Sequence, residues 1–231
     1  MAVYAIGDLH LSHHQPKPMG VFGPEWDDHP AKIRRNWNRV VGDDDLVIVA
    51  GDISWAMQLA EAAPDLEWLA ELNGEKLLVR GNHDYWWSAI GKVRAALPAR
   101  MHALQNDHFP WKGWAICGTR GWLCPGEAGF NPDEDEKIYR RELLRLELSL
   151  QSSLRAGFSN LLAVLHYPPY PRQGPPSSFT GLLEKAGVKH CVFGHIHDAG
   201  REAIFRGEWG GVNYHFVAAD GVDFTPALII P

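Results

Sequence analysis

The spacing of apolar residues in the first half of the chain predicts strands that alternate with helices. Three apolar runs have the length of short buried strands, at residues 2–6, 46–50 and 76–79. Apolar residues recur at helical spacing over residues 31–41, 59–72 and 86–97. Pro64 is expected to mark the true start of the second helix. Strands and helices in this order form parallel sheets with right-handed crossovers, so the pattern indicates an α/β protein.

The second half of the chain is less regular. Two strands with a turn between them are expected at 103–104 and 114–117, followed by a glycine-rich loop over 118–131. The longest predicted helix covers 133–155, with Asn131 or Asp133 as its N-cap. The remaining expected elements are a strand at 161–165, a proline-rich loop at 168–176, a helix at 179–186, a strand at 191–193 and closing, mostly antiparallel strands at 203–205, 214–217 and 227–230. Because no linker or repeat interrupts the pattern, a single domain over residues 1–231 is expected.

The composition narrows the classes of function. The chain has 231 residues, of which 45% are hydrophobic and 22% charged, as in an ordinary folded protein. Its formal net charge is -6 and no block of like charge stands out, which argues against extended duplex nucleic acid as a partner. No apolar run is long enough to span a bilayer. Three cysteines without metal-type or redox spacing, and no targeting segment before the first strand, predict a cytoplasmic protein.

Metal-capable side chains follow five of the predicted strands. The segments are Asp8-Leu9-His10, Gly51-Asp52, Gly81-Asn82-His83-Asp84, His166 and Gly194-His195-Ile196-His197. The carboxyl ends of parallel strands meet at one edge of a sheet, and side chains two residues apart at a strand end point the same way. These side chains are therefore expected to converge. The candidate metal ligands are Asp8, His10, Asp52, Asn82, His166, His195 and His197.

This ligand set predicts two divalent metal ions. Asp52 has two carboxylate oxygens and can bridge them. Mixed nitrogen and oxygen ligands suit Mn, Fe or Zn, and also Ni or Co, rather than Ca or Mg. Two such ions would activate a bridging hydroxide and hold a phosphoryl group for in-line attack. His83 is the candidate proton donor to the leaving group, and Asp84 is expected to orient its imidazole or raise its pKa.

The five segments together resemble, in order and spacing, the signature of the calcineurin-like metallophosphoesterase superfamily. The resemblance implies an αββα sandwich of two mixed β-sheets flanked by helices, with a dinuclear metal site at the loops on one edge. It implies that one metal is held by Asp8, His10, Asp52 and His197, and the other by Asp52, Asn82, His166 and His195. It also implies that His83 is the general acid or the leaving-group contact. The stretches 52–57, 82–87, 118–122 and 137–142 are similar to a group of small bacterial predicted phosphohydrolases, which implies one catalytic domain and no particular substrate.

Several side chains near the predicted site are candidates for substrate contacts. Trp55, Trp86 and Trp122 could wall a pocket for an aromatic or nucleoside group, although a tryptophan is more often simply a core residue. Arg120 follows a strand end and could contact phosphate or form a surface salt bridge. The helix over 133–155 could cover the site as a lid, but packing on a sheet is the simpler interpretation.

The predicted function is that of a metal-dependent phosphohydrolase, a phosphoesterase that cleaves P–O bonds of a small phosphate ester, either a monoester or a diester. A nuclease acting on short or single-stranded nucleic acid is the enzymatic alternative, and the acidic net charge counts against it. A non-catalytic scaffold of the same fold would be expected to lose ligands or the histidine after Asn82, and all of them are present. A regulatory metal sensor would change conformation with metal and show no turnover.

Overall fold

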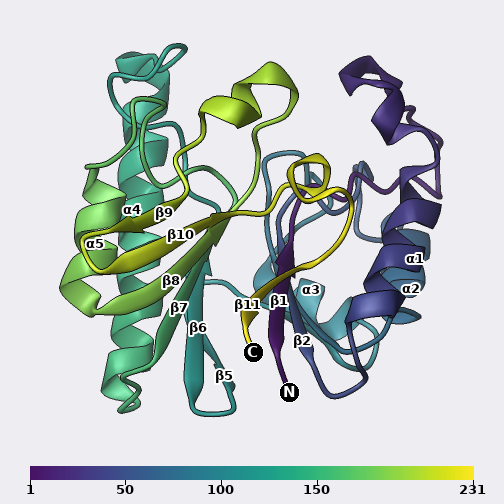
Figure 1. The fold of residues 1–231 in the computed structure, drawn as a ribbon, viewed down its shortest axis with the longest axis horizontal. Coiled ribbons are helices and arrows are strands. Elements are labelled where there is room, and N and C mark those ends of the chain that lie inside the picture. Colours follow the sequence, from purple (N-terminus) through teal and green to yellow (C-terminus); the bar gives the residue numbers. More distant parts are fainter.

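Two β-sheets lie face to face between two layers of helices, as Figure 1 shows. The computed structural model describes the backbone of residues 1–231 and every side chain except those of Asp198 and Ala199. The first sheet has the strand order β11 (Ala227–Ile230), β1 (Val3–Ile6), β2 (Leu46–Ala50), β3 (Glu75–Val79) and β4 (Met101–Ala103). The second has the order β5 (His108–Trp111), β6 (Trp114–Thr119), β7 (Leu161–Leu165), β8 (Val188–Phe193), β10 (Val212–Phe216) and β9 (Gly207–Trp209).

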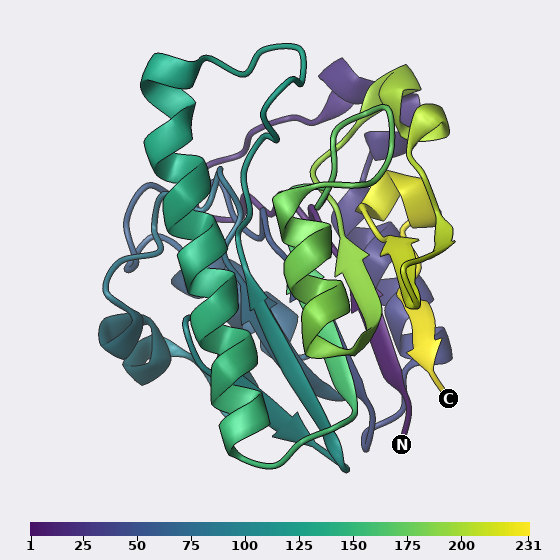
Figure 2. The ribbon, with the colours of Figure 1, turned by 90° about the vertical axis from the view of Figure 1, so that its left-hand side faces the viewer.

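Each sheet carries helices on its outer face. The helices are α1 (His29–Val40), α2 (Ala63–Ala70), α3 (Ile90–Ala96), α4 (Pro132–Arg155) and α5 (Ser178–Ala186). Trp37 of α1 and Leu66 of α2 are among the buried residues that pack on the first sheet. Leu146 of α4 and Phe179 of α5 pack on the second sheet, where Figure 2 shows the two helices side by side. A third apolar layer lies between the sheets, so the αββα sandwich of two mixed sheets that the sequence predicts is confirmed.

The direction of the strands decides where polar side chains gather. Strands β1 to β4 run parallel to one another, and so do β6, β7, β8 and β10. Only edge strands run the other way: β11 beside β1, β5 beside β6 and β9 beside β10. The loops that follow β1, β2, β3, β7 and β8 therefore meet at one edge of the sandwich, which is where an open parallel sheet builds its site.

Some elements differ from the sequence prediction. The helix predicted over 86–97 begins only at Ile90, because Trp86 and Trp87 are buried in the turn before it. The strand β4 pairs with β3, and β5, which the apolar pattern does not reveal because Pro110 lies in it, forms a hairpin with β6. No strand forms at 203–205, where a 3₁₀ helix ends at Ala203 and β9 begins at Gly207. Strand β10, expected to be antiparallel, pairs parallel with β8.

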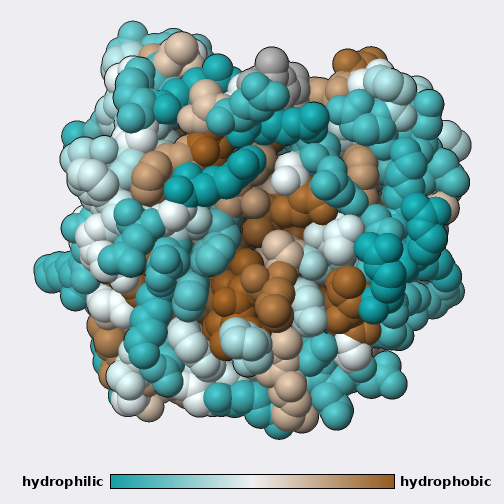
Figure 3. Space-filling view, in the orientation of Figure 1, coloured by the Kyte–Doolittle hydropathy of each residue, from teal (hydrophilic) through white to brown (hydrophobic). Residues whose placement is uncertain are grey.

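Helix α4 is part of the scaffold and does not cover the site as a lid. The side chain of Asn131 caps it by accepting a hydrogen bond from the backbone N–H of Asp133 at 3.1 Å. Leu146 and Leu150 are buried against the second sheet. None of the described helices has both the length and the hydrophobicity needed to cross a bilayer. Figure 3 shows a largely hydrophilic face with hydrophobic residues gathered in its middle, where the apolar layer between the sheets reaches the surface.

Candidate metal centre

Four candidate ligands have a left-handed backbone conformation, which is costly for residues other than glycine. The φ angles are 58° at Asp8, 46° at His10, 51° at Asp52 and 76° at His195. Each such residue costs about 1–3 kcal/mol unless the surrounding structure enforces it. The loops after β1 and β2 enforce one another, because the N–H groups of Asp8 and His10 donate to the carbonyls of Gly51 and Asp52 at 2.8 and 2.9 Å. Strained backbone of this kind is typical of functional sites.

Two glycines allow the chain to pass close to the candidate ligands. A Cβ atom at Gly81 would collide with the carboxylate and backbone N of Asp52. A Cβ atom at Gly194 would collide with the carboxylate of Asp8. The glycines in these two segments are therefore required by the packing of backbone against carboxylate, and not by a left-handed conformation, since neither of them has a positive φ.

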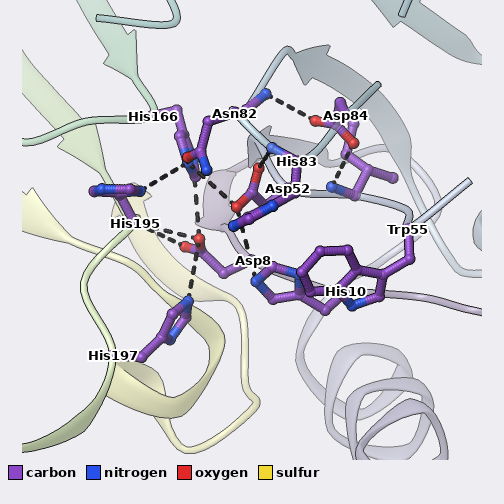
Figure 4. A network of polar contacts seen from close by, with 12 residues as sticks. Asp8, His10, Asp52, Trp55, Asn82, His83, Asp84, His166, His195 and His197 are labelled. Atoms are coloured by element: carbon purple, nitrogen blue, oxygen red, sulfur yellow. Dashed lines mark hydrogen bonds and ion pairs between the residues drawn. The ribbon is translucent and has the colours of Figure 1, made fainter. Parts of the chain in front are cut away.

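The predicted ligands converge in two groups of three side chains, which Figure 4 shows together. Asp8, His10 and His197 form the first group, and Asp52, His166 and His195 form the second. In each group, the potential ligand atoms lie within 4.8 Å of one another. The side chains of the two aspartates, His10 and His166 are buried, so these polar groups have little access to water.

Asn82 extends the second group, and the backbone N–H of His195 connects that group to Asp8 of the first. The Nε2 of His166 lies 2.7 Å from the Oδ1 of Asn82 and 3.4 Å from the Oδ2 of Asp52. The Nδ1 of His195 lies 3.2 Å from the same Nε2 of His166. The backbone N–H of His195 contacts both carboxylate oxygens of Asp8, at 3.2 and 3.0 Å. All seven predicted ligands therefore belong to one continuous polar network.

The histidines are oriented as metal ligands would be. The Nδ1 of His166 is 2.9 Å from the carbonyl oxygen of Ala50, which can only accept, so Nδ1 carries a proton and Nε2 is the nitrogen that a cation could bind once it displaces the second proton. The Nδ1 of His197 is 3.1 Å from the Oδ1 of Asp220, and its Nε2 is buried without a hydrogen-bond partner among the described residues. The Nε2 of His10 lies toward the other ligands, 3.8 Å from the Oδ2 of Asp52, while its Nδ1 is buried without a hydrogen-bond partner within the described part of the chain. A buried imidazole nitrogen that faces the other candidate ligands and has no hydrogen-bond partner there is available to bind a cation.

Asp220 is a residue that the sequence does not reveal. It lies in the 3₁₀ helix Ala219–Val222 after β10, where no motif marks it. Its Oδ1 contacts His197 and its Oδ2 accepts from the Nη1 of Arg201 at 2.9 Å. A carboxylate that holds the second nitrogen of a metal-binding imidazole is the usual support of such a ligand. The signal that could have found it is spatial, because the pairing of β10 with β8 and the hydrogen bond from the N–H of Ala219 to the carbonyl of Gly7 at 3.0 Å bring it to the site.

Opposite charges stabilise the network in the absence of cations. Burial alone would raise the pKa of Asp52, but His166 outweighs it and holds that pKa well below its ordinary value. Burial would lower the pKa of His166, but Asp52 raises it to about 9. Similarly, Asp220 and Asp8 overcome burial and raise the pKa of His197 to about 10. By contrast, burial lowers the pKa of His10 and of His195 well below the ordinary value. In the metal-free protein, the positive charges of His166 and His197 therefore lie beside the carboxylates of Asp52 and Asp8, where the candidate cations would bind.

His83 and Trp55 lie beside the ligands. The backbone N–H of His83 donates to the Oδ1 of Asp52 at 2.8 Å, and the half-buried ring lies 4.5 Å from the ring of Trp55. Trp55 stacks on His10, with 4.8 Å between the ring centroids. These residues line a cavity of about 270 Å³. The other lining residues are Phe22, Asp52, Arg172, His195, Ile196 and His197. Phe22, at the end of the 3₁₀ helix Gly20–Phe22, and Arg172, in the proline-rich loop, carry no pattern that predicts this position.

The structure corrects the expectations for Asp84 and Trp86. The Asp84 carboxylate is fully buried and accepts from the N–H groups of Gly81, Ile53 and Ser54 at 2.7, 2.9 and 3.2 Å, as Figure 4 shows in part. The indole N–H of Trp86 also donates to it, at 2.9 Å. Among the described residues, none of these contacts involves the ring of His83, so Asp84 does not orient it. Trp86 is only 1% exposed and cannot wall a pocket.

Arg120 and Trp122 lie outside the cavity beside the ligands. The Nη2 of Arg120 is 3.8 Å from the Oε1 of Glu142 on α4, and its guanidinium lies 4.5 Å from the ring of Trp122. The indole N–H of Trp122 donates to Asp135 at 2.9 Å. Arg120 therefore forms a buried ion pair in place of the predicted surface one, because Glu142 has no exposed surface. Neither residue is among those that line the cavity.

Comparison with known proteins agrees with this architecture. A family model described as calcineurin-like phosphoesterase matches residues 1–199, which contain all seven candidate ligands, and confirms the resemblance seen in the sequence. The crystal structure of phosphopantetheinyl hydrolase (PptH) from Mycobacterium tuberculosis has a TM-score of 0.57 at 15% identity, covering 100% of this chain and 96% of that one. This likeness shows the fold.

Three curated proteins match part of the chain. The gene 66 protein of Mycobacterium phage L5 is 34% identical over 129 residues, which are 46% of this chain and 62% of that protein. The gene 66 protein of Mycobacterium phage D29 is 30% identical over 133 residues, which are 48% and 65%. The uncharacterized protein MJ1445 of Methanocaldococcus jannaschii is 33% identical over 129 residues, which are 54% and 67%. The chain thus matches less than two thirds of the length of the phage proteins.

Proposed function

This chain belongs to the calcineurin-like phosphoesterase family, and on that premise we propose that it is a metal-dependent hydrolase of small phosphate esters. The observation that carries the proposal is the convergence of six ligating side chains in two adjacent groups at one edge of the sandwich. All six lie within the part of the chain that the family model matches. The αββα scaffold places them at the ends of parallel strands, where a substrate can approach.

The proposed centre holds two divalent transition-metal ions, for which Mn, Fe and Zn suit the mixed nitrogen and oxygen donors. Asp8, His10, Asp52 and His197 would hold one ion, and Asp52, Asn82, His166 and His195 the other. When bound, two such ions supply Lewis acidity toward water and toward the phosphoryl oxygens. The residues themselves contribute a buried, pre-arranged set of donors whose orientation is fixed by Ala50 and Asp220.

His83 is the proposed proton donor to the leaving group. It lines the cavity together with Asp52 and Trp55, so a substrate bound there would meet its imidazole. Burial lowers the pKa of His83, which makes its imidazolium a stronger acid. The negative charge of a bound phosphate ester would favour protonation of His83, while the two bound cations would oppose it. Trp55, packed against both His10 and His83, would keep these rings in place.

The test is hydrolysis of bis-4-nitrophenyl phosphate and of 4-nitrophenyl phosphate by metal-stripped protein, with Mn, Zn, Ni, Co and Fe restored in turn. The expected result is turnover only with metal, and the preferred ester then separates a diesterase from a monoesterase. His14→Ala, an exposed change in the loop after β1, is the matched control for His10→Ala and should retain activity. Protein that binds two ions and hydrolyses neither ester with any metal would contradict the proposal.

A further inference from the structure

Four arginines and one glutamate form a cluster beside α4 that the proposed reaction does not use. We call Arg80, Arg120, Arg141, Arg145 and Glu142 the arginine cluster. Arg80 follows β3 and Arg120 follows β6, while the other three residues lie on α4. The cluster therefore joins the carboxyl ends of one strand from each sheet to the middle of the longest helix, which stands before β6 in Figure 2.

The cluster carries more positive charge than it can neutralise internally. The Oε1 of Glu142 lies 2.9 Å from the Nη1 of Arg145, 3.6 Å from the Nε of Arg141 and 3.8 Å from the Nη2 of Arg120. Its other oxygen accepts the hydroxyl of Thr119 at 2.5 Å. Guanidinium groups stay charged in proteins, so even when the buried carboxylate of Asp84, which acts on Arg80, is counted with Glu142, four guanidiniums leave a surplus of two positive charges. One arginine would be enough to pair with Glu142.

Two of the guanidiniums have donors without acceptors. The Nε of Arg80 and the Nε of Arg120 are buried and have no hydrogen-bond partner among the described residues. Leaving a buried donor unpaired is costly, and more so when it is charged. A small hollow of about 20 Å³, which has room for one oxygen of an anion while the rest of the anion stays at its mouth, is lined by Arg80, Arg120, Arg145, Gln105, Asn106 and Thr119. The acceptors that the cluster lacks can therefore come from a ligand that enters this hollow.

The arginine cluster adjoins the candidate metal centre. Arg80 is separated from Asn82 by Gly81 alone. The backbone carbonyl of Arg120 accepts from the N–H groups of His166 and Tyr167 at 3.0 and 2.9 Å. The ring of Tyr167 in turn lies 3.9 Å from that of His195. The hollow therefore adjoins the loops that carry Asn82 and His166, two ligands of the second proposed ion.

We propose that the arginine cluster is a binding site for a phosphate-type oxyanion. Guanidinium groups bind such anions through two parallel N–H donors, and several guanidiniums held in place by a buried carboxylate form a preorganised site for the three or four oxygens of a phosphoryl group. The anion is either a second phosphoryl group of the substrate or free inorganic phosphate. The first source rests on the proposed function, whereas the binding site itself does not.

Titration of metal-loaded protein with inorganic phosphate by calorimetry, in a chloride-free buffer, tests the site. The double variant Arg80→Gln/Arg145→Gln should bind one equivalent of phosphate fewer than the wild type. The matched control is Arg140→Gln, an exposed residue of α4 that pairs with Glu136 at 2.5 Å and should bind as the wild type does. Arg80→Lys, which keeps the charge but not the forked geometry, should weaken the same binding event at least about tenfold.

Equal stoichiometry in the wild type and the folded double variant, with an unchanged Kd in Arg80→Lys, would overturn the proposal. The two sources are separated by comparing thymidine 5′-(4-nitrophenyl phosphate) with its 3′-phosphorylated form as substrates. A lower KM for the 3′-phosphorylated form, lost in the double variant, assigns the site to the substrate, and equal KM values assign it to free phosphate. Failure of the proposed function would appear as no turnover of either ester while the difference in phosphate stoichiometry persists.

Discussion

Replacing Asp220 with asparagine tests whether this residue supports a metal ligand through His197. The change keeps the size of the side chain and removes its charge. In the structure, the Oδ1 of Asp220 is 3.1 Å from the Nδ1 of His197, and its Oδ2 is fixed by Arg201 at 2.9 Å. The carboxylate therefore holds the ring with Nε2 toward Asp8, at 3.5 Å, and makes that nitrogen more basic. An asparagine can hold the ring but supplies less electron density.

The expected magnitude follows from the charge that Asp220 stabilises. Asp220 and Asp8 together raise the pKa of His197 from 6.5 to about 10 against the effect of burial. At 1.36 kcal/mol for each tenfold change in protonation, this net shift corresponds to about 5 kcal/mol, and because burial opposes it, the two carboxylates together interact with a positive charge on the ring by more than that amount. A metal ion on Nε2 senses part of the share that belongs to Asp220. Loss of a supporting carboxylate of this kind weakens metal binding about 10–100-fold, or about 1.4–2.7 kcal/mol.

The assay is competition between the protein and a fluorescent chelator for Zn²⁺ or Mn²⁺, which resolves the two binding steps. We expect Asp220→Asn to weaken one step 10–100-fold and to leave the other nearly unchanged. Saturating metal should then restore most of the activity, which a folding defect would not allow. The control is Asp223→Asn, an exposed residue three positions further along that should bind as the wild type does. Unchanged affinity in Asp220→Asn, or an equal loss at both steps, would refute the reasoning.

Three further predictions concern the centre itself. Asp52→Asn removes the shared carboxylate and should lower metal content at both sites and abolish hydrolysis; elemental analysis that finds two ions in an active variant would show that Asp52 is not the bridge. His83→Ala should retain both ions and slow poor leaving groups more than good ones, and an equal loss across a series of aryl phosphates would argue against proton donation. In metal-free protein, the raised pKa of His166 means that its pairing with Asp52 stabilises the fold fully below pH 6.5 and is lost as the pH rises through about 9. Urea unfolding in the presence of a chelator should therefore show a loss of up to about 3 kcal/mol between pH 6.5 and 9.5, and equal stability at the two values would disprove the pairing.

The sequence predicts the fold and the convergence of the ligands because both depend on strand direction. Strands that alternate with helices must run parallel, and parallel strands bring their carboxyl ends to one edge. Asp8 and Asp52 follow neighbouring strands of the first sheet and His166 follows a strand of the second, so their meeting requires that the two sheets stack with these carboxyl ends at the same edge. The central strands β2 and β7 have the predicted bounds because they are buried along their whole length.

The parts that could not be predicted depend on partners that are distant in the sequence. The parallel pairing of β10 with β8 leaves no local trace, and without it neither the orientation of β10 nor the position of Asp220 can be inferred. The arginines of the cluster follow strands and a helix with ordinary periodicity, and only the packing of α4 beside β6 brings Arg80 and Arg145 together around Glu142. Edge strands such as β5 are short and half exposed, so their apolar pattern is weak.

Asp84 shows how a residue in a recognisable segment can act in a way that the segment does not suggest. Next to His83 in the sequence, it is expected to act on the imidazole, yet it accepts from the N–H groups of Ile53 and Ser54. These two residues directly follow Asp52, whose φ of 51° places it in a costly conformation. Burial and the charge of Asp52 raise the pKa of Asp84 to about 6, which means that they destabilise its charged form. Four hydrogen bonds to the carboxylate offset part of this effect. Asp84 therefore fixes the strained backbone that presents Asp52, and its effect on the proposed reaction passes through that carboxylate and not through His83.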